Sequence, residues 1–416
     1  MTSARRTAAV LSVVAFVAFV VTAALLVPWD WVPGGRVVPV QPDQVFSARQ
    51  VERATAYSSA QRHLGWALLA VSLVVGPLLG LTPLGARVVG RLRGWWWWRA
   101  LLATLLVLLV GEVATGPFAV LLRRNALEAG LSTQAWPGWV RDQVVSLGVS
   151  WVYAGLLVLL VVGVARRAPR RWPLVVGVVA ALLVVVGSWV YPVVVEPLFN
   201  RFTSLPDGSL RSQVLALAEE EGVPVSDVLV ADASRRTTTL NAYVSGLGST
   251  RRVVLYDNLV DDVPRRETLV IVAHELGHAK NHDVALGTTL SALGVTAGVG
   301  LLGLLLGPAL LRRAGVPSAG SAGSAGSVPL LLVLVTVGTL LASPVENTVS
   351  RAIEARADRE SLAATGDVEA FERVQERLAV RSLADPEPPA WSQFWFGSHP
   401  TALQRIGLAR GWQQAR

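Results

Sequence analysis

Five consecutive residues in the second half of the chain have the types and spacing of a hydrolytic metal site. The segment reads His274-Glu275-Leu276-Gly277-His278. On a helix, residues four apart lie on one face, so both imidazoles can reach one zinc ion at about 2.0–2.1 Å. Glu275 is rotated by roughly 100° from His274 and does not ligate. It can instead take a proton from a zinc-bound water, which is the chemistry of a metalloprotease.

A catalytic zinc site needs a third protein ligand, and the chain has no cysteine to supply a thiolate. His282 follows His278 by four residues, but three ligands stacked along one straight helix cannot easily surround one ion. We therefore regard His282 mainly as a supporting or structural residue. Position 284, where a longer zinc motif has its third histidine, is Val284. A glutamate from another helix is the better ligand, and the candidates are Glu346, Glu354 and Glu360.

Glu354 is the third ligand that we expect. In the segment Glu354-Ala355-Arg356-Ala357-Asp358 the two carboxylates are one turn apart on one helix face. One could bind the metal while the other accepts a hydrogen bond from a ligand imidazole. The alternative is a solvated helix with i,i+4 salt bridges, because three arginines lie nearby.

Long apolar segments indicate that a membrane surrounds the elements that position these residues. The chain has 416 residues, of which 52% are hydrophobic and only 16% are charged. A bilayer core needs roughly 20 apolar residues per helix. The first candidate resembles a signal peptide, but it is long and lacks a typical cleavage site, so we expect a retained helix. The seven candidate spans are residues 8–27, 64–82, 100–122, 143–165, 172–195, 284–311 and 328–345.

Two polar stretches carry the motif residues. In the first we expect a helix over 209–221, strands at 228–233, 237–245 and 252–257, a turn at 246–250, and a motif helix from about residue 265. In the second, helices with a break at 385–389 are expected, and the Glu354 helix begins just after the seventh span. We divide the chain into a transmembrane region 1–196, a first protease part 197–283, two spans 284–345 with a Gly/Ala/Ser-rich loop 314–327, and a second protease part 346–416.

The charge of the chain indicates contact with lipid rather than with nucleic acid. The net charge is +8, and Lys280 is the only lysine. Short arginine clusters beside the apolar segments suit anionic headgroups. The loops 83–99 and 166–171 hold four arginines each and no acids, so the positive-inside rule places their side in the cytoplasm and the catalytic stretch outside.

In its ordered set of motifs the chain resembles the type 1 CAAX prenyl proteases, integral-membrane zinc endopeptidases, and would be a bacterial member. The resemblance covers about residues 40–410. It implies about seven transmembrane helices enclosing a chamber and a gluzincin-like α+β zinc-protease domain at one membrane face, so the expected fold is mainly α. It rests on Pro197–Phe202, Asn241–Tyr243, Val254–Asp257, His274–His278, Asn347–Arg351, Glu354–Asp358 and Ser398–Pro400.

The resemblance also implies residue roles. His274, His278 and Glu354 would bind one zinc ion per chain, and Glu275 would be the general base. Asp358 would orient a ligand, and Asn347 would support the site. The remaining roles are oxyanion stabilisation by His399 with Arg405, and pairing with extended substrate by an edge strand at Asn241, Ala242 and Tyr243.

Together these features predict a membrane-embedded zinc metalloendopeptidase in the cell membrane. Its substrates would be peptides or flexible, membrane-associated protein segments, and its partners would be substrate and the lipid bilayer, not nucleic acid. The sequence does not specify an oligomeric state. The alternative is an inactive receptor or transporter with a vestigial site, which the intramembrane Glu112 favours. The intact Glu275 favours the enzyme.

Overall fold

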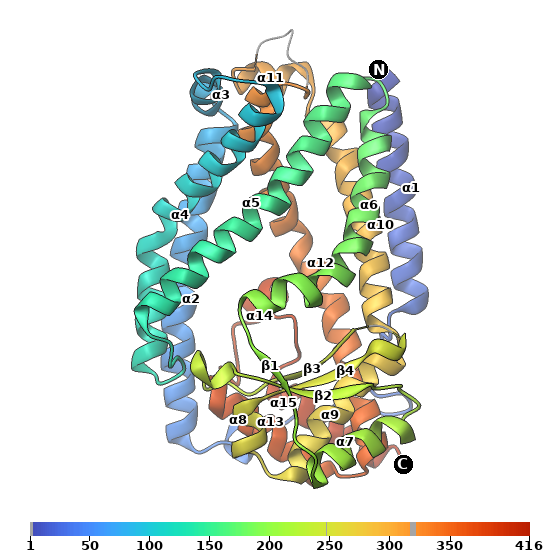
Figure 1. The fold of residues 1–416 in the computed structure, drawn as a ribbon. Coiled ribbons are helices and arrows are strands. Elements are labelled where there is room, and N and C mark those ends of the chain that lie inside the picture. The colour runs from blue at the N-terminus through green and yellow to red at the C-terminus, as the bar shows by residue number, and fades with distance from the viewer. Residues whose placement is uncertain (1–2, 247, 317–321) are drawn as a thin grey trace.

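Seven long apolar helices form most of the structure, as the sequence predicted. The computed structural model describes residues 3–246, 248–316 and 322–416. Figure 1 shows the long helices standing along one direction, with α5 crossing obliquely between α4 and α6, and with the sheet and shorter helices gathered at one end. The candidate membrane helices are α1 (Ser3–Leu26), α2 (Ala48–Gly80), α4 (Trp96–Glu128), α5 (Trp136–Arg167), α6 (Trp172–Val190), α10 (Asp283–Leu305) and α12 (Val328–Thr365).

A four-stranded sheet lies at this end. Its strands are β1 (Phe202–Ser204), β2 (Asp227–Ala231), β3 (Ala242–Ser245) and β4 (Arg252–Tyr256), in the order β1-β2-β4-β3. β2 and β4 are parallel, whereas β1 and β3 pair antiparallel with their neighbours. β3 is therefore an edge strand of this sheet. The three-residue strand β1 was not predicted because it is too short to show an alternating pattern.

β3 begins five residues later than the sequence predicted. The chain before it packs against the loop between α4 and α5 instead of pairing within the sheet. Thr237 forms an isolated bridge with Ser132, and its Oγ1 donates to the Leu131 carbonyl. The polar side chains of this segment thus bond to a neighbouring loop, a tertiary contact that local β-propensity does not reveal.

Five of the six shorter helices at this end share one hydrophobic core with the sheet, whereas the sixth, Ala390–Phe396, packs against α12. Leu255 of β4, Leu276, Leu362 and Phe371 are fully or almost fully buried in that core. The core fixes the motif helix α9 between the sheet and α12. The shorter helices are α7 (Ser209–Glu220), α8 (Asp257–Asp262), α9 (Arg265–Lys280), α13 (Val368–Ser382), α14 (Ala390–Phe396) and α15 (Ala402–Gln414).

One continuous helix carries both the seventh span and Glu354, whereas the sequence predicted a new helix after the span. α12 runs for 38 residues through Pro344. The Thr348 hydroxyl donates to the Pro344 carbonyl at 2.7 Å within this stretch. A change from apolar to polar residues marks where a helix leaves the membrane, and helical hydrogen bonds do not depend on it. Glu354 is therefore joined rigidly to a membrane span.

A turn at Asn281 and His282 joins the motif helix to the sixth span. His282 adopts a left-handed conformation with φ 56° and precedes α10. At the far end of the long helices lie α3 (Pro83–Gly90) and α11 (Pro308–Arg313). Two expected segments lie partly outside the described residues. These are the turn at 246–250, of which residue 247 is not described, and the loop at 314–327, of which residues 317–321 are not described. The loop ends in a 3₁₀ turn, Ala325–Ser327.

Candidate active site

The motif helix α9 lies directly against α12, which brings the histidines and Glu354 together. The Ser361 hydroxyl of α12 donates to the Val270 carbonyl of α9 at 2.7 Å. At Gly277, a Cβ atom would lie 2.8 Å from the Cβ of Glu360, which is closer than real Cβ contacts allow. The glycine within the motif is therefore needed for the two helices to approach this closely.

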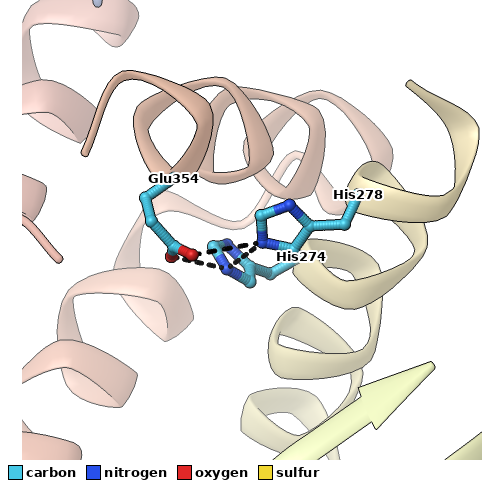
Figure 2. A group of neighbouring side chains, drawn as sticks. All are labelled: His274, His278 and Glu354. Atoms are coloured by element: carbon cyan, nitrogen blue, oxygen red, sulfur yellow. Dashed lines mark hydrogen bonds and ion pairs between the residues drawn. The ribbon is translucent and has the colours of Figure 1, made fainter. Parts of the chain in front are cut away.

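His274, His278 and Glu354 converge on one point, as Figure 2 shows. The Nε2 atom of His274 lies 3.2 Å from Nε2 of His278 and 3.2 Å from Oε2 of Glu354. Nε2 of His278 lies 3.5 Å from Oε1 of the same carboxylate. Tetrahedral zinc with Zn–N distances of about 2.0–2.1 Å separates its ligands by about 3.3 Å. The two imidazole nitrogens and the Glu354 carboxylate thus have the spacing of one face of a zinc site.

The hydrogen bonds of the two histidines indicate that a cation fits here. Nδ1 of His274 lies 3.0 Å from Asp358 Oδ1, and Nδ1 of His278 lies 2.8 Å from Asp283 Oδ2. A carboxylate accepts hydrogen bonds, so each Nδ1 carries the proton and each Nε2 presents a lone pair. Two lone pairs then face each other beside Glu354, whose buried Oε2 has no hydrogen-bond donor. A metal ion satisfies all three groups.

The electrostatics of the site also favour positive charge. Without a metal, burial disfavours the charged form of His278, but the adjacent carboxylates of Asp283 and Glu354 stabilise the protonated ring and raise the pKa of this imidazole to about 10. The pKa of His274 is also raised, because the carboxylates of Asp358 and Glu354 stabilise its protonated form by more than burial disfavours it. Carboxylates that hold a proton this firmly also attract a divalent cation.

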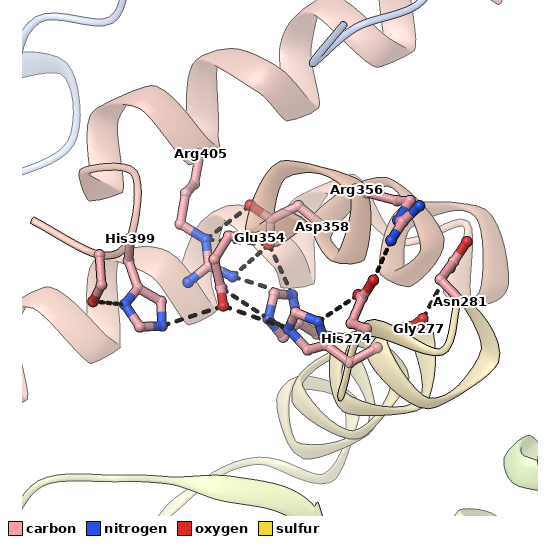
Figure 3. A network of polar contacts seen from close by, with 11 residues as sticks. His274, Gly277, Asn281, Glu354, Arg356, Asp358, His399 and Arg405 are labelled. Atoms are coloured by element: carbon pink, nitrogen blue, oxygen red, sulfur yellow. Dashed lines mark hydrogen bonds and ion pairs between the residues drawn. The ribbon is translucent and has the colours of Figure 1, made fainter. Parts of the chain in front are cut away.

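Each ligand histidine is oriented by a carboxylate that an arginine holds in turn (Figure 3). Arg405 of α15 donates through Nε to both oxygens of the fully buried Asp358, at 3.1 and 2.9 Å. Arg356 of α12 bonds to Asp283. Asp283 was given no role from the sequence, where it was the last residue of the first protease part, directly before the span predicted at 284–311. Its position immediately after the left-handed turn is the structural reason that it reaches His278.

A pocket of about 380 Å³ is lined by two of the metal-site residues, His274 and Glu354, together with the start of the edge strand. Asn241 and Ala242 line it, as does Glu275. Burial raises the pKa of Glu275 above its ordinary value, even though the neighbouring histidines oppose the shift. A carboxylate with a raised pKa is a better proton acceptor at neutral pH. Glu275 is therefore suited to act as a general base.

The loop between α14 and α15 brings His399 to the same pocket. Its Nε2 lies 3.4 Å from Glu354 Oε1, and its Nδ1 lies 2.9 Å from the Ser398 hydroxyl. Gln393 donates to the His399 carbonyl at 2.7 Å. Arg351 in turn donates to the Gln393 carbonyl at 3.1 Å. His399 and Arg405 both line the pocket. The predicted pair therefore lies beside the motif helix, although both residues are distant from it in the sequence.

Two of the expected site residues have other contacts. The Tyr243 hydroxyl donates to Glu196 at 3.2 Å, and its side chain packs with residues of the opposite face of the sheet. Asn347 lies two turns before Glu354 and donates to the Trp395 carbonyl at 2.6 Å, which places it beside α14.

The other residues considered as ligands lie outside the converging group. Glu346 and His282 are exposed. Glu360 pairs with Lys280 at 2.9 Å, although it lies close to Gly277. Among the described residues, only His274, His278 and Glu354 form such a group.

Two family descriptions match nearly the whole chain. Residues 204–413 match peptidase family M48, and residues 34–201 match the CAAX prenyl protease N-terminal region with its five membrane helices. The two matches are adjacent in the chain, and together they include most of the membrane helices and the whole metal site.

Curated relatives and a solved structure agree with these matches. The chain is 30% identical over 298 residues to an uncharacterized metalloprotease, YhfN, of Bacillus subtilis, covering 72% of this chain and 70% of the relative. It is 31% identical over 292 residues to a CAAX prenyl protease 1 homolog of Arabidopsis thaliana, covering 68% and 66%. The crystal structure of S. mikatae Ste24p has the same fold, with a TM-score of 0.79 at 19% identity over 97% of this chain and 99% of that one.

Proposed function

The chain belongs to peptidase family M48 and is a membrane metalloprotease, and we propose that its metal is zinc, held by His274, His278 and Glu354. The observation that carries this proposal is the convergence of two imidazole lone pairs and a buried carboxylate on one point. When bound, zinc would act as a Lewis acid toward water and toward the peptide carbonyl. Family membership favours this enzyme over an inactive receptor or transporter.

Around the metal, we assign the remaining steps to four side chains. Glu275 takes the proton from the attacking water and delivers it to the leaving amine. Asp358 holds the His274 ring in the tautomer that leaves Nε2 free. His399, with Arg405 beside it, stabilises the negative charge that develops on the carbonyl oxygen.

The edge strand β3 positions substrate in extended form. Tyr256 donates to the Asn241 carbonyl at 3.1 Å, so in the antiparallel ladder the backbone groups of the next residue, Ala242, point toward the open edge. An extended peptide could pair there beside Glu275. A folded domain could not present such a segment, so we propose peptides and flexible or membrane-associated protein segments as substrates.

The site sits where the membrane spans meet the protease part. α12 links Glu354 to the seventh span, and α9 leads through His282 into the sixth. We propose that residues 197–283 and 346–416 form one protease domain, split by the spans in 284–345 and preceded by the transmembrane region 1–196. The protein would then reside in the cell membrane, with its pocket near one face.

The substitution Glu275→Gln tests the mechanism. Because the amide cannot accept the proton but the ligands remain, we expect zinc content to stay near one per chain while kcat falls by about 10²–10⁴-fold. Metal analysis and cleavage of a fluorogenic peptide by the same purified sample provide the measurement. Glu219→Gln, which changes an exposed acid on α7, should alter neither value. Undiminished cleavage by a zinc-loaded Glu275→Gln protein would exclude Glu275 as the base.

A further inference from the structure

A second cavity, which the proposed proteolysis does not use, lies at the end of the helices opposite the metal site. It has a volume of about 1180 Å³ and lies between the start of α4, the end of α5, the start of α6 and the turn Ala325–Ser327. In Figure 1 these ends are at the top, whereas α9 and the sheet are at the bottom. A ligand here would therefore contact the other membrane face.

Three arginines give this cavity its positive charge. Arg99, Arg166 and Arg167 line it. Nη2 of Arg99 donates to the Val89 carbonyl at 3.4 Å, and its Nε is buried without a hydrogen-bond partner. Arg166 donates to the Gly323 carbonyl at 3.1 Å and lies 5.3 Å from the ring centre of Trp96. The protein itself thus satisfies these guanidinium groups only in part.

No carboxylate is available nearby to neutralise the arginines. The sequence has no Asp or Glu in residues 53–111, 143–195 or 284–345, which together form every wall of the cavity. Arginines without carboxylate partners at a membrane surface attract anions, and their planar forks match the geometry of phosphate oxygens. The charge therefore indicates a phosphate-bearing ligand.

The rest of the lining is apolar and adjoins a membrane–water boundary. Leu159, Leu160, Val164 and Val175 form part of the wall. In the segment that leads into the cavity, Trp95 is 76% exposed, and tryptophans mark the headgroup level of a bilayer. A cavity at the headgroup level that has both basic groups and apolar walls suits a ligand with an anionic head and a hydrocarbon tail.

We propose that this basic cavity, defined by Trp96, Arg99, Arg166 and Arg167, binds the headgroup phosphate of an anionic phospholipid. The phosphate would accept charge-assisted hydrogen bonds from the arginines, while the first part of the acyl chains lies against the apolar wall. Ligand pockets commonly have volumes of about 300–1,000 Å³, so this cavity has room for both parts. A soluble phosphate compound shares the charged chemistry but would leave the apolar wall uncovered.

Binding of fluorescent phosphatidylglycerol to the purified full-length protein in neutral detergent tests the proposal. Arg99→Gln and Arg167→Gln should each weaken binding by about tenfold, because each removes a charged donor. Arg170→Gln removes an equal charge from an exposed position on the same face but outside the cavity, and should change the dissociation constant by less than about twofold. Unlabelled phosphatidylglycerol should displace the probe, whereas phosphatidylcholine and inorganic phosphate should not.

Three results would overturn the proposal. An equal loss in Arg170→Gln would mean diffuse surface attraction rather than a site. Displacement by phosphatidylcholine, whose phosphate is balanced by a choline cation, would mean that the cavity does not select a headgroup with net negative charge. Displacement by millimolar inorganic phosphate would assign the cavity to a soluble anion. Peptide cleavage by the same samples verifies that each variant is folded, and if Arg99→Gln fails this control the exposed Arg167→Gln decides.

Discussion

Glu354 reaches the histidines from a different helix, and among the three acids considered it alone approaches both imidazoles. We expect Glu354→Ala to lose bound zinc, because a two-histidine site holds the ion poorly, whereas His282→Ala keeps it. His282 is exposed at the turn between α9 and α10, so its removal leaves the ligand atoms in place. Metal analysis of the two purified variants is the measurement. The reverse pattern of loss would assign the third ligand to His282.

Asp283 acts on the metal through His278 and not by direct contact. Its carboxylate fixes the His278 ring and increases the electron density on Nε2. Asp283→Asn keeps the size of the side chain but removes its charge, so we expect zinc affinity to fall by about 10–100-fold. Competition with a chromophoric chelator gives the affinity, and Asp261→Asn on the exposed face of α8 is the matched control. Equal zinc affinities of the unmodified protein, Asp283→Asn and Asp261→Asn would mean that Asp283 only supports the turn.

The edge strand β3 makes a prediction about the substrate backbone. If an extended peptide pairs with the edge beside Ala242, only alternate substrate residues face the strand. Replacing successive peptide N–H groups by ester oxygens should then lower kcat/KM at every second position, by about 2–10-fold for each lost hydrogen bond. The kinetics of such a peptide series provide the measurement. A uniform effect along the series would contradict strand pairing.

At the scale of elements, the sequence predicted the motif helix closely because its signals are local. The helix expected from about residue 265 begins at Arg265, and the strand expected at 252–257 ends at Tyr256. The continuity of α12 and the late start of β3 were not predictable, since both depend on contacts between distant segments. Asp283 was missed for the same reason, because it contacts His278 only through the conformation of the turn at Asn281 and His282.

At the scale of the whole molecule, the seven spans follow directly from hydropathy, whereas their arrangement does not. Apolar length identifies a span but says nothing about which helices are neighbours. The structure brings α9 and the last part of α12, which carry the two halves of the metal site, together at one end of the molecule. It gathers four separate arginine clusters, at 5–6, 87–99, 166–171 and 312–313, at the opposite end. The basic cavity arises from this arrangement and has no linear motif.

The proposed proteolysis requires a metal-dependent site that accepts only extended chains. Its most direct test is the cleavage rate of a fluorogenic peptide by the purified protein, before and after removal of the metal. We predict that a chelator lowers the rate to background and that about one zinc ion per chain restores it. A tightly folded protein with the same recognition sequence should be cut far more slowly than the peptide. Undiminished peptide cleavage by metal-free protein would mean that catalysis needs no metal, and equal rates on peptide and folded protein would mean that the site is open rather than enclosed.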